Sequence, residues 1–244
     1  MTTTTFDAHP RSSLIVALDF DSLNSAVKFA KQVSDLVGMF KIGSQLFTAA
    51  GPDIVREIVA RGEKVFLDLK YHDIPNTVAG AVGSASRLGV SLLTLHGLGG
   101  RAMMEAAEGA LPAMGLRLLA ITILTSHDEA GLQEVGVLLS LTDSVRRLAR
   151  LAKEAGIDGV VASPHEVGHI REACGRGFLI VTPGIRPAGS HAGDQARLAT
   201  PATALAAGAD YLVVGRPIIE ARDPAAAAAA IVREMETAPA PPPA

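Results

Sequence analysis

The chain alternates eight times between a short apolar run, typical of a buried strand, and a segment whose apolar residues have helical spacing. The expected strands are 14–19, 39–43, 64–70, 91–96, 116–123, 157–162, 178–181 and 211–214. Strands that are apolar throughout and alternate with helices predict a parallel sheet covered by helices. No change of composition marks a linker, so we expect a single α/β domain.

Two parallel architectures fit this alternation, and the polar residues decide between them. Eight units in 244 residues match the size of a (β/α)8 TIM barrel, whereas an open doubly wound sheet would bind its ligand at one switch point. The residues at or just beyond the expected strand ends are Asp19, Lys41, Asp68, Lys70, His96 and Thr125. In a barrel these ends converge on one mouth, where catalytic groups belong. We therefore predict a barrel over residues 12–236, a flexible leader over 1–11 and a disordered Pro/Ala tail over 237–244.

Composition argues against several kinds of partner. Lys and Arg number 22 against 25 Asp and Glu, a net charge of −3 with no basic block, so neither nucleic acid nor an anionic membrane surface is an expected partner. The apolar runs are too short to span a bilayer, and residues 1–11 lack the apolar core of a signal peptide. The single Cys174 excludes an internal disulfide framework and a cysteine-based metal site. A cytoplasmic location is the simplest expectation.

The stretch 66–77, FLDLKYHDIPNT, carries the strongest functional signal. Alternation along the strand puts Asp68 and Lys70 on one face at its carboxyl end, and Asp73 follows at the turn. Charge on a buried strand is costly unless it is paired or used. A lone Asp-x-Lys is more often a structural ion pair. Three charges within six residues, followed by Pro75, Asn76 and Thr77, favour a functional site.

Two glycine-arginine loops predict a phosphate site. Gly215-Arg216-Pro217 follows the eighth expected strand and opens a helix, and Pro183-Gly184-Ile185-Arg186 follows the seventh. A helix N-terminus offers free N–H groups, glycine admits an anion to the backbone, and arginine can bind it bidentately. Gly-Arg-Pro alone is more often a cap. Barrels, however, often build a phosphate site from the loops after strands seven and eight.

The loop 188–197 and His96 each have more than one interpretation from the sequence. Gln195 lies in a polar loop, 188–197, that could be a lid or an ordinary solvated loop. His96 could be an acid, a ligand or a packed polar residue, and we favour the last. Five other histidines, at 72, 127, 165, 169 and 191, are scattered, so a histidine metal site has little support.

Taken together, these motifs resemble one enzyme family. Asp68-x-Lys70-x-x-Asp73-Ile74-Pro75-Asn76-Thr77 is similar to the signature of orotidine 5′-phosphate decarboxylases. The likeness extends to residues 16–19, 41–43, 124–126, 182–187 and 215–217, and it covers the chain from about Leu14 to Met235. The resemblance implies decarboxylation of orotidine 5′-phosphate to UMP and CO2 without a cofactor or a metal, the last step of de novo UMP biosynthesis.

The resemblance also implies residue roles and a homodimer with shared active sites. The implied catalytic set is Lys70, Asp68, Asp73 and Lys41. Lys70 would protonate C6 of the pyrimidine and Asp68 would lie against the substrate carboxylate, while Asp73 and Thr77 would reach the neighbouring subunit's site. The remaining expected contacts are Asp19 and Lys41 to the ribose hydroxyls, Thr125 to the pyrimidine, Arg186, Gly215 and Arg216 to the phosphate, and Gln195 from the closing loop to the phosphate.

Two alternatives compete with this interpretation. A related sugar-phosphate decarboxylase or aldolase would share Asp-x-Lys-x-x-Asp on the same barrel but use a divalent metal. The Ile74–Thr77 continuation and Thr125 favour the nucleotide substrate instead. A non-catalytic barrel that binds phosphoribosyl ligands is the second alternative. The complete set of Asp68, Lys70 and Asp73 argues against it, because a binding module needs no buried proton donor.

Overall fold

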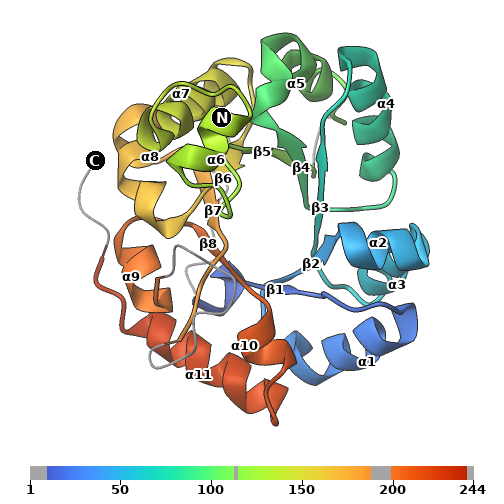
Figure 1. Cartoon of the computed structure of the whole chain (residues 1–244). Coiled ribbons are helices and arrows are strands. Elements are labelled where there is room, and N and C mark those ends of the chain that lie inside the picture. The colour runs from blue at the N-terminus through green and yellow to red at the C-terminus, as the bar shows by residue number, and fades with distance from the viewer. Residues whose placement is uncertain (1–9, 113–114, 188–198, 241–244) are drawn as a thin grey trace.

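A computed structural model describes residues 10–112, 115–187 and 199–240. Eight parallel strands form a closed barrel in chain order, and the helices surround it as an outer ring (Figure 1). The strands are β1 (Leu14–Ala17), β2 (Met39–Gly43), β3 (Val65–Tyr71), β4 (Leu92–His96), β5 (Arg117–Ile121), β6 (Gly159–Val161), β7 (Leu179–Thr182) and β8 (Tyr211–Val214). Pairing of β8 with β1 closes the sheet and confirms the barrel over the open sheet.

Eleven α-helices cover the barrel within the described residues. They are α1 (Leu23–Val33), α2 (Ser44–Ala50), α3 (Asp53–Val59), α4 (Pro75–Ser86), α5 (Gly100–Glu108), α6 (Glu129–Glu134), α7 (Leu141–Glu154), α8 (Val167–Cys174), α9 (Pro201–Ala206), α10 (Arg216–Ile219) and α11 (Pro224–Glu236). Short 3-10 turns occupy Pro10–Ser13, Ser34–Leu36, Gly97–Gly99 and Pro164–Glu166. None of these described helices combines the length and apolarity needed to cross a membrane.

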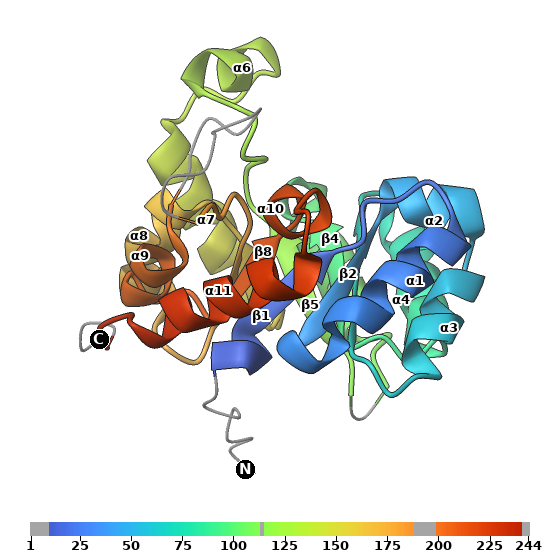
Figure 2. The same cartoon turned by 90° about the horizontal axis from the view of Figure 1, so that it is seen from below.

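Three helical details go beyond the alternation of strands and helices read from the sequence. The short α2 follows β2 directly, and α6 lies within the stretch 126–140 between β5 and α7. The helical stretch after β8 is divided into α10 and α11, because Asp223 caps α11 through the Ala226 N–H and Pro224 occupies its first turn. Figure 2 shows α6 standing clear of the ring of helices at one end of the barrel.

The expected leader and tail fall partly outside the described residues. Pro10 and Arg11, which the sequence assigns to the leader, begin a 3-10 turn that runs into β1. At the other end, α11 finishes at Glu236, the last residue of the predicted barrel domain. Residues 1–9 and 241–244 lie beyond what the structure describes.

Strand alternation sorts the core into two layers. Ile15, Phe66, Leu92, Leu119 and Val181 belong to a small apolar cluster inside the barrel, whereas their strand neighbours pack with the helices in the larger cluster. On β3, Phe66 therefore faces inward and Leu67 faces the helices. The same alternation turns Asp68 inward, above the apolar floor that Phe66 provides.

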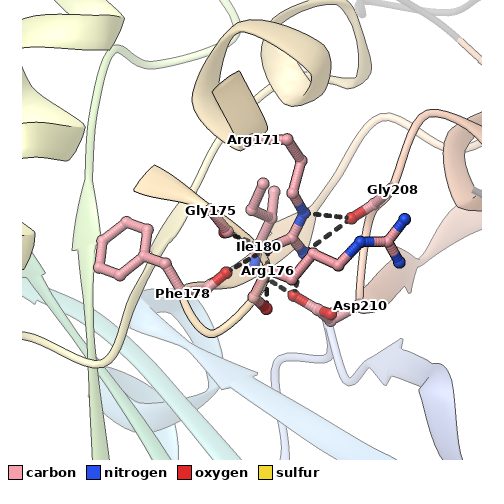
Figure 3. Close-up of polar contacts among 7 residues, drawn as sticks. All are labelled: Arg171, Gly175, Arg176, Phe178, Ile180, Gly208 and Asp210. Carbon is pink, nitrogen blue, oxygen red and sulfur yellow. Dashed lines mark hydrogen bonds and ion pairs between the residues drawn. The ribbon is translucent and has the colours of Figure 1, made fainter. Parts of the chain in front are cut away.

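A partly buried arginine holds the amino-terminal ends of β7 and β8 (Figure 3). Arg171 of α8 donates to the backbone carbonyls of Gly175, Arg176, Phe178 and Gly208. Its Nη2 also contacts Asp210 Oδ2 at 2.6 Å, and that oxygen accepts the Ile180 N–H at 2.7 Å. Burial raises the pKa of Asp210, and the Arg171 charge opposes that shift. The cluster ties together the two strands whose opposite ends carry Arg186 and Arg216.

Candidate active site

One cavity opens at the carboxyl ends of the strands. It has a volume of about 260 Å³ and an apolar floor that includes Phe66, Ile121 and Val161. Eight of the residues predicted to form a site line it: Asp19, Lys41, Asp68, Lys70, Thr125, Arg186, Gly215 and Arg216. These residues are far apart in the sequence, and closure of the barrel brings them to one mouth.

A chain of alternating charges lies along one wall of this cavity. Lys70 Nζ lies 2.9 Å from Asp68 Oδ1, Lys41 Nζ lies 3.7 Å from Asp68 Oδ2, and Lys41 Nζ lies 3.5 Å from Asp19 Oδ1. Pairing two ammonium groups with two carboxylates keeps the array near neutrality and lowers its desolvation cost. The Lys41 side chain is 13% exposed and the Lys70 side chain 37%, so Lys70 presents the more accessible ammonium.

The backbone is irregular at Lys70. Its φ is +53°, the only positive value among the non-glycine residues that the structure describes. Leu67 pairs with Leu93 on β4, but the next pair is Tyr71 with Leu95, so the register shifts across this stretch. Non-glycine residues rarely adopt such a φ, and those that do cluster at functional sites. Alternation alone did not predict this irregularity.

Two arginines also line the cavity. Arg186 follows β7, and Arg216 begins α10 directly after β8. Burial lowers the pKa of Arg186, the nearby charge of Arg216 lowers it further, and Glu220 opposes both. Gly184 has a φ of +77°, which favours glycine in the turn that presents Arg186. Two like charges held close together favour binding of an anion with more than one negative charge.

Two predicted site residues do not line this cavity, and a third lies outside the described residues. Asp73 and Thr77 are exposed and are not among the described residues that line it. The Asp73 carboxylate accepts the Ile74 N–H at 2.6 Å, at the turn that leads into α4. Gln195 lies outside the residues that the structure describes, so its predicted contact stays a prediction.

His96 is packed against His72 beside the mouth. The two rings stack with centroids 5.3 Å apart, and His96 Nδ1 accepts the Leu98 N–H at 3.3 Å. Burial lowers the pKa of His96 to about 4, and the charges of His72, Lys70 and His127 add to the effect. Over residues 10–112, 115–187 and 199–240, no group of three His, Cys, Asp or Glu side chains could hold a metal ion. A neutral, packed imidazole agrees with the sequence-based interpretation.

Sequence reasoning missed one polar residue in contact with the charge array. Thr94 on β4 is fully buried, and its hydroxyl contacts both Asp68 and the Lys70 backbone. A threonine within an apolar strand is ordinary β-sheet composition, so the sequence carries no signal for this role.

Comparison with known proteins gives a consistent result. The family model "Orotidine 5'-phosphate decarboxylase / HUMPS family" matches residues 12–231. Orotidine 5′-phosphate decarboxylase from Moorella thermoacetica is 52% identical over 236 residues, covering 93% of this chain and 94% of that protein. The enzyme of the same name from Geotalea daltonii is 56% identical over 230 residues, covering 92% and 96%.

A solved structure agrees with both relatives. The crystal structure of orotidine 5′-phosphate decarboxylase from Lactobacillus acidophilus superposes with a TM-score of 0.82 at 40% identity, covering 92% of this chain and 99% of that one. With a family model matched over nearly the whole barrel and relatives above half identity, this chain belongs to the orotidine 5′-phosphate decarboxylase / HUMPS family.

Proposed function

We propose that this protein is an orotidine 5′-phosphate decarboxylase that converts orotidine 5′-phosphate to UMP and CO2 without a metal or an organic cofactor. The observation that carries the proposal is the Lys41-Asp68-Lys70 array beside an arginine pair in one cavity. Relatives that share more than half of their residues with this chain bear the same enzyme name. A cytoplasmic location is part of the proposal, as expected for UMP biosynthesis.

The cavity suggests how the substrate would lie. Arg186 and Arg216 would hold the 5′-phosphate, with the backbone of Gly215 beside it and Gln195 reaching it from the loop after β7. Asp19 and Lys41 would bind the ribose hydroxyls, and Thr125 would meet the pyrimidine. Ile121 and Val161 supply an apolar surface for the ring. This orientation directs C6 of the ring towards Lys70.

The chemistry then follows from charge. When the bond between C6 and the carboxylate breaks, its electron pair stays on C6 and CO2 leaves. The Lys70 ammonium stabilises that developing charge and then donates a proton to C6, after which neutral Lys70 recovers a proton from water. Asp68 would lie against the substrate carboxylate and disfavour the bound ground state. Binding of the remote phosphate supplies free energy to position the ring.

We further propose a homodimer in which Asp73 and Thr77 reach the partner's site. Support comes from exposure, because residues 72–77 are all exposed in the isolated chain. Ile74 is 66% exposed and Leu98 is 48% exposed, on the loops after β3 and β4 that the His72–His96 stack holds together. Large apolar side chains exposed near one another often indicate a protein interface.

The decisive functional test uses purified protein treated with a chelator. Mixing it with orotidine 5′-phosphate should produce the loss of ultraviolet absorbance that accompanies decarboxylation, with release of CO2. Activity that disappears on chelation and returns with a divalent metal would instead support a metal-dependent sugar-phosphate enzyme. Nucleotide binding without CO2 release would support a binding-only barrel.

Complementation tests the shared site. Lys70→Ala and Asp73→Ala should each be inactive, and a heterodimer of the two would assemble one site with both defects and one with neither. Mixing them under conditions that allow subunit exchange should restore about half of wild-type activity per heterodimer, or roughly a quarter for an equal mixture in which half of the dimers are heterodimers. If exchange is confirmed independently and no activity returns, Asp73 does not serve the partner's site.

A further inference from the structure

We propose that Thr94 is a positioning residue for decarboxylation, because its single hydroxyl fixes both the Asp68 carboxylate and the Lys70 backbone. The inference rests on the proposed decarboxylase function. It concerns a residue that would not touch substrate, since Thr94 is not among the described residues lining the cavity.

Thr94 lies inside the barrel next to the charge array. It is fully buried on β4, and strand alternation places it on the same inward face as Leu92. Its Oγ1 lies 2.9 Å from Asp68 Oδ1 and 2.9 Å from the Lys70 backbone nitrogen. One side chain on β4 therefore contacts two proposed catalytic residues on β3.

The direction of both hydrogen bonds follows from the chemistry of the groups. An ionised carboxylate only accepts, and a backbone N–H only donates. The Thr94 hydroxyl therefore gives its one proton to Asp68 and accepts the Lys70 N–H. Because a β-branched side chain has few accessible χ1 rotamers, this oxygen is held at a fixed place on β4.

The backbone contact compensates for the irregularity in the sheet. The register shift between Leu67 and Tyr71 leaves Lys70 outside the regular β3–β4 pairing, and Lys70 has a φ of +53°. A buried N–H without an acceptor is costly, so this conformation needs a substitute for the backbone partner. The Thr94 hydroxyl supplies that substitute and stabilises the conformation that directs Lys70 into the cavity.

The carboxylate contact sets the orientation of Asp68. Its Oδ1 accepts from both Lys70 Nζ and Thr94 Oγ1, each at 2.9 Å, while Oδ2 lies 3.7 Å from Lys41 Nζ. Two bonds to Oδ1 oppose rotation of the carboxylate, which keeps the Lys70 ammonium in one place. Misplacement of a reacting group by about 1 Å can reduce the rate by roughly a hundredfold. A small displacement of the Lys70 ammonium or the Asp68 carboxylate should therefore lower kcat measurably.

The experiment compares Thr94→Val with Thr94→Ser and with Thr122→Val. Valine keeps the shape and removes the hydroxyl, whereas serine keeps the hydroxyl. Thr122 is a matched control, since it is also fully buried and its hydroxyl donates to the Val161 carbonyl at 3.2 Å. Thermal unfolding of each variant checks folding, and UMP binding checks that the cavity still accepts nucleotide.

We expect Thr94→Val to lower kcat by about tenfold to a hundredfold, the loss of a hydrogen bond to a charged group. Its KM and UMP affinity should change less than about threefold, because the phosphate and ribose contacts remain. Thr94→Ser should recover most of the wild-type kcat, and Thr122→Val should stay within about threefold of wild type.

Several results would overturn the assignment. They are a kcat for Thr94→Val close to wild type, a serine variant as impaired as the valine variant, or an equal loss in Thr122→Val. If neither Thr94→Val nor Thr94→Ala folds, Thr94 serves stability and the assignment is wrong. A wild-type protein that releases no CO2 would instead contradict the proposed function, and the role of Thr94 with it.

Discussion

Replacing Arg216 by alanine should weaken binding of phosphorylated ligands while leaving the bare nucleoside almost unaffected. Arg216 and Arg186 line the same side of the cavity, and the positive charge of Arg216 helps to lower the pKa of Arg186. A bound phosphate would relieve this repulsion by accepting from both guanidinium groups. Loss of one hydrogen bond to a charged group costs about 1.5–3 kcal/mol, or roughly a tenfold to 150-fold loss of affinity.

The exposure of the two arginines sets where in this range each loss of affinity should fall. Arg216 is exposed and Arg186 is half-buried, and contacts in water are screened more than buried ones. Arg216→Ala should therefore reduce the affinity for UMP by about tenfold, and Arg186→Ala should reduce it by more. Arg56→Ala is a matched control, because Arg56 is an exposed arginine that pairs with Asp53 on α3.

Titration calorimetry with UMP and with uridine gives the required comparison. UMP should bind the two cavity variants more weakly, uridine should bind all proteins similarly, and Arg56→Ala should match wild type. UMP should also raise the melting temperature of wild type more than that of either cavity variant. An equal loss for UMP and uridine would show that Arg216 shapes the cavity instead of holding phosphate, and would refute the reasoning.

Three further predictions follow from particular contacts. Arg171→Ala leaves the partly buried Asp210 carboxylate with the Ile180 N–H but without its charged partner, so urea unfolding should show a loss of about 3 kcal/mol, the low end of the range for breaking a buried ion pair; a loss below about 1 kcal/mol would contradict the role of Arg171 in holding the two strands. His96 has a folded pKa of about 4, below its unfolded 6.5, so the unfolded state binds protons first and stability falls as pH decreases through this window. His96→Asn should reduce the loss of unfolding free energy between pH 7 and 5 by about 1 kcal/mol, a value discounted for the half-exposed ring. An unchanged dependence of the unfolding free energy on pH would contradict this prediction. A Cβ at Gly43 would lie 3.0 Å from Lys41 Nζ, so Gly43→Ala should lower kcat by roughly tenfold with little change in melting temperature; a large drop in melting temperature would show a backbone effect instead.

The sequence predicted the barrel because apolar strands, helical spacing and polar strand ends all agree in eight successive units. It also predicted that Asp19, Lys41, Asp68, Lys70 and Thr125 lie at one mouth, since closure of a parallel barrel leaves little choice about where strand ends converge. His96, from the same predicted set, packs beside the mouth and does not line the cavity. Residues 218–235 are largely helical, and the apolar run of alanines hides the break that Asp223 and Pro224 impose between α10 and α11.

Other features of the structure could not be predicted from the sequence pattern. The positive φ of Lys70 and its contact with Thr94 arise from a register shift between two strands, which no single strand's pattern records. The α6 helix is only six residues long, too short for periodicity to reveal within a polar stretch. The predicted roles of Asp73 and Thr77 concern a second copy of the chain, and that of Gln195 concerns residues outside those described.

The most direct test of the central claim is the decarboxylation rate of Lys70→Ala, measured beside its affinity for UMP. Lys64→Ala serves as control, because Lys64 is exposed just before β3 and lies at the opposite end of that strand from the cavity. If Lys70 donates the proton to C6, its alanine variant should fold, bind UMP with a smaller change than in turnover, and lose nearly all activity. Lys64→Ala should match wild type. Substantial turnover by folded Lys70→Ala would contradict the account, because the Lys70 ammonium would then not be needed to protonate C6.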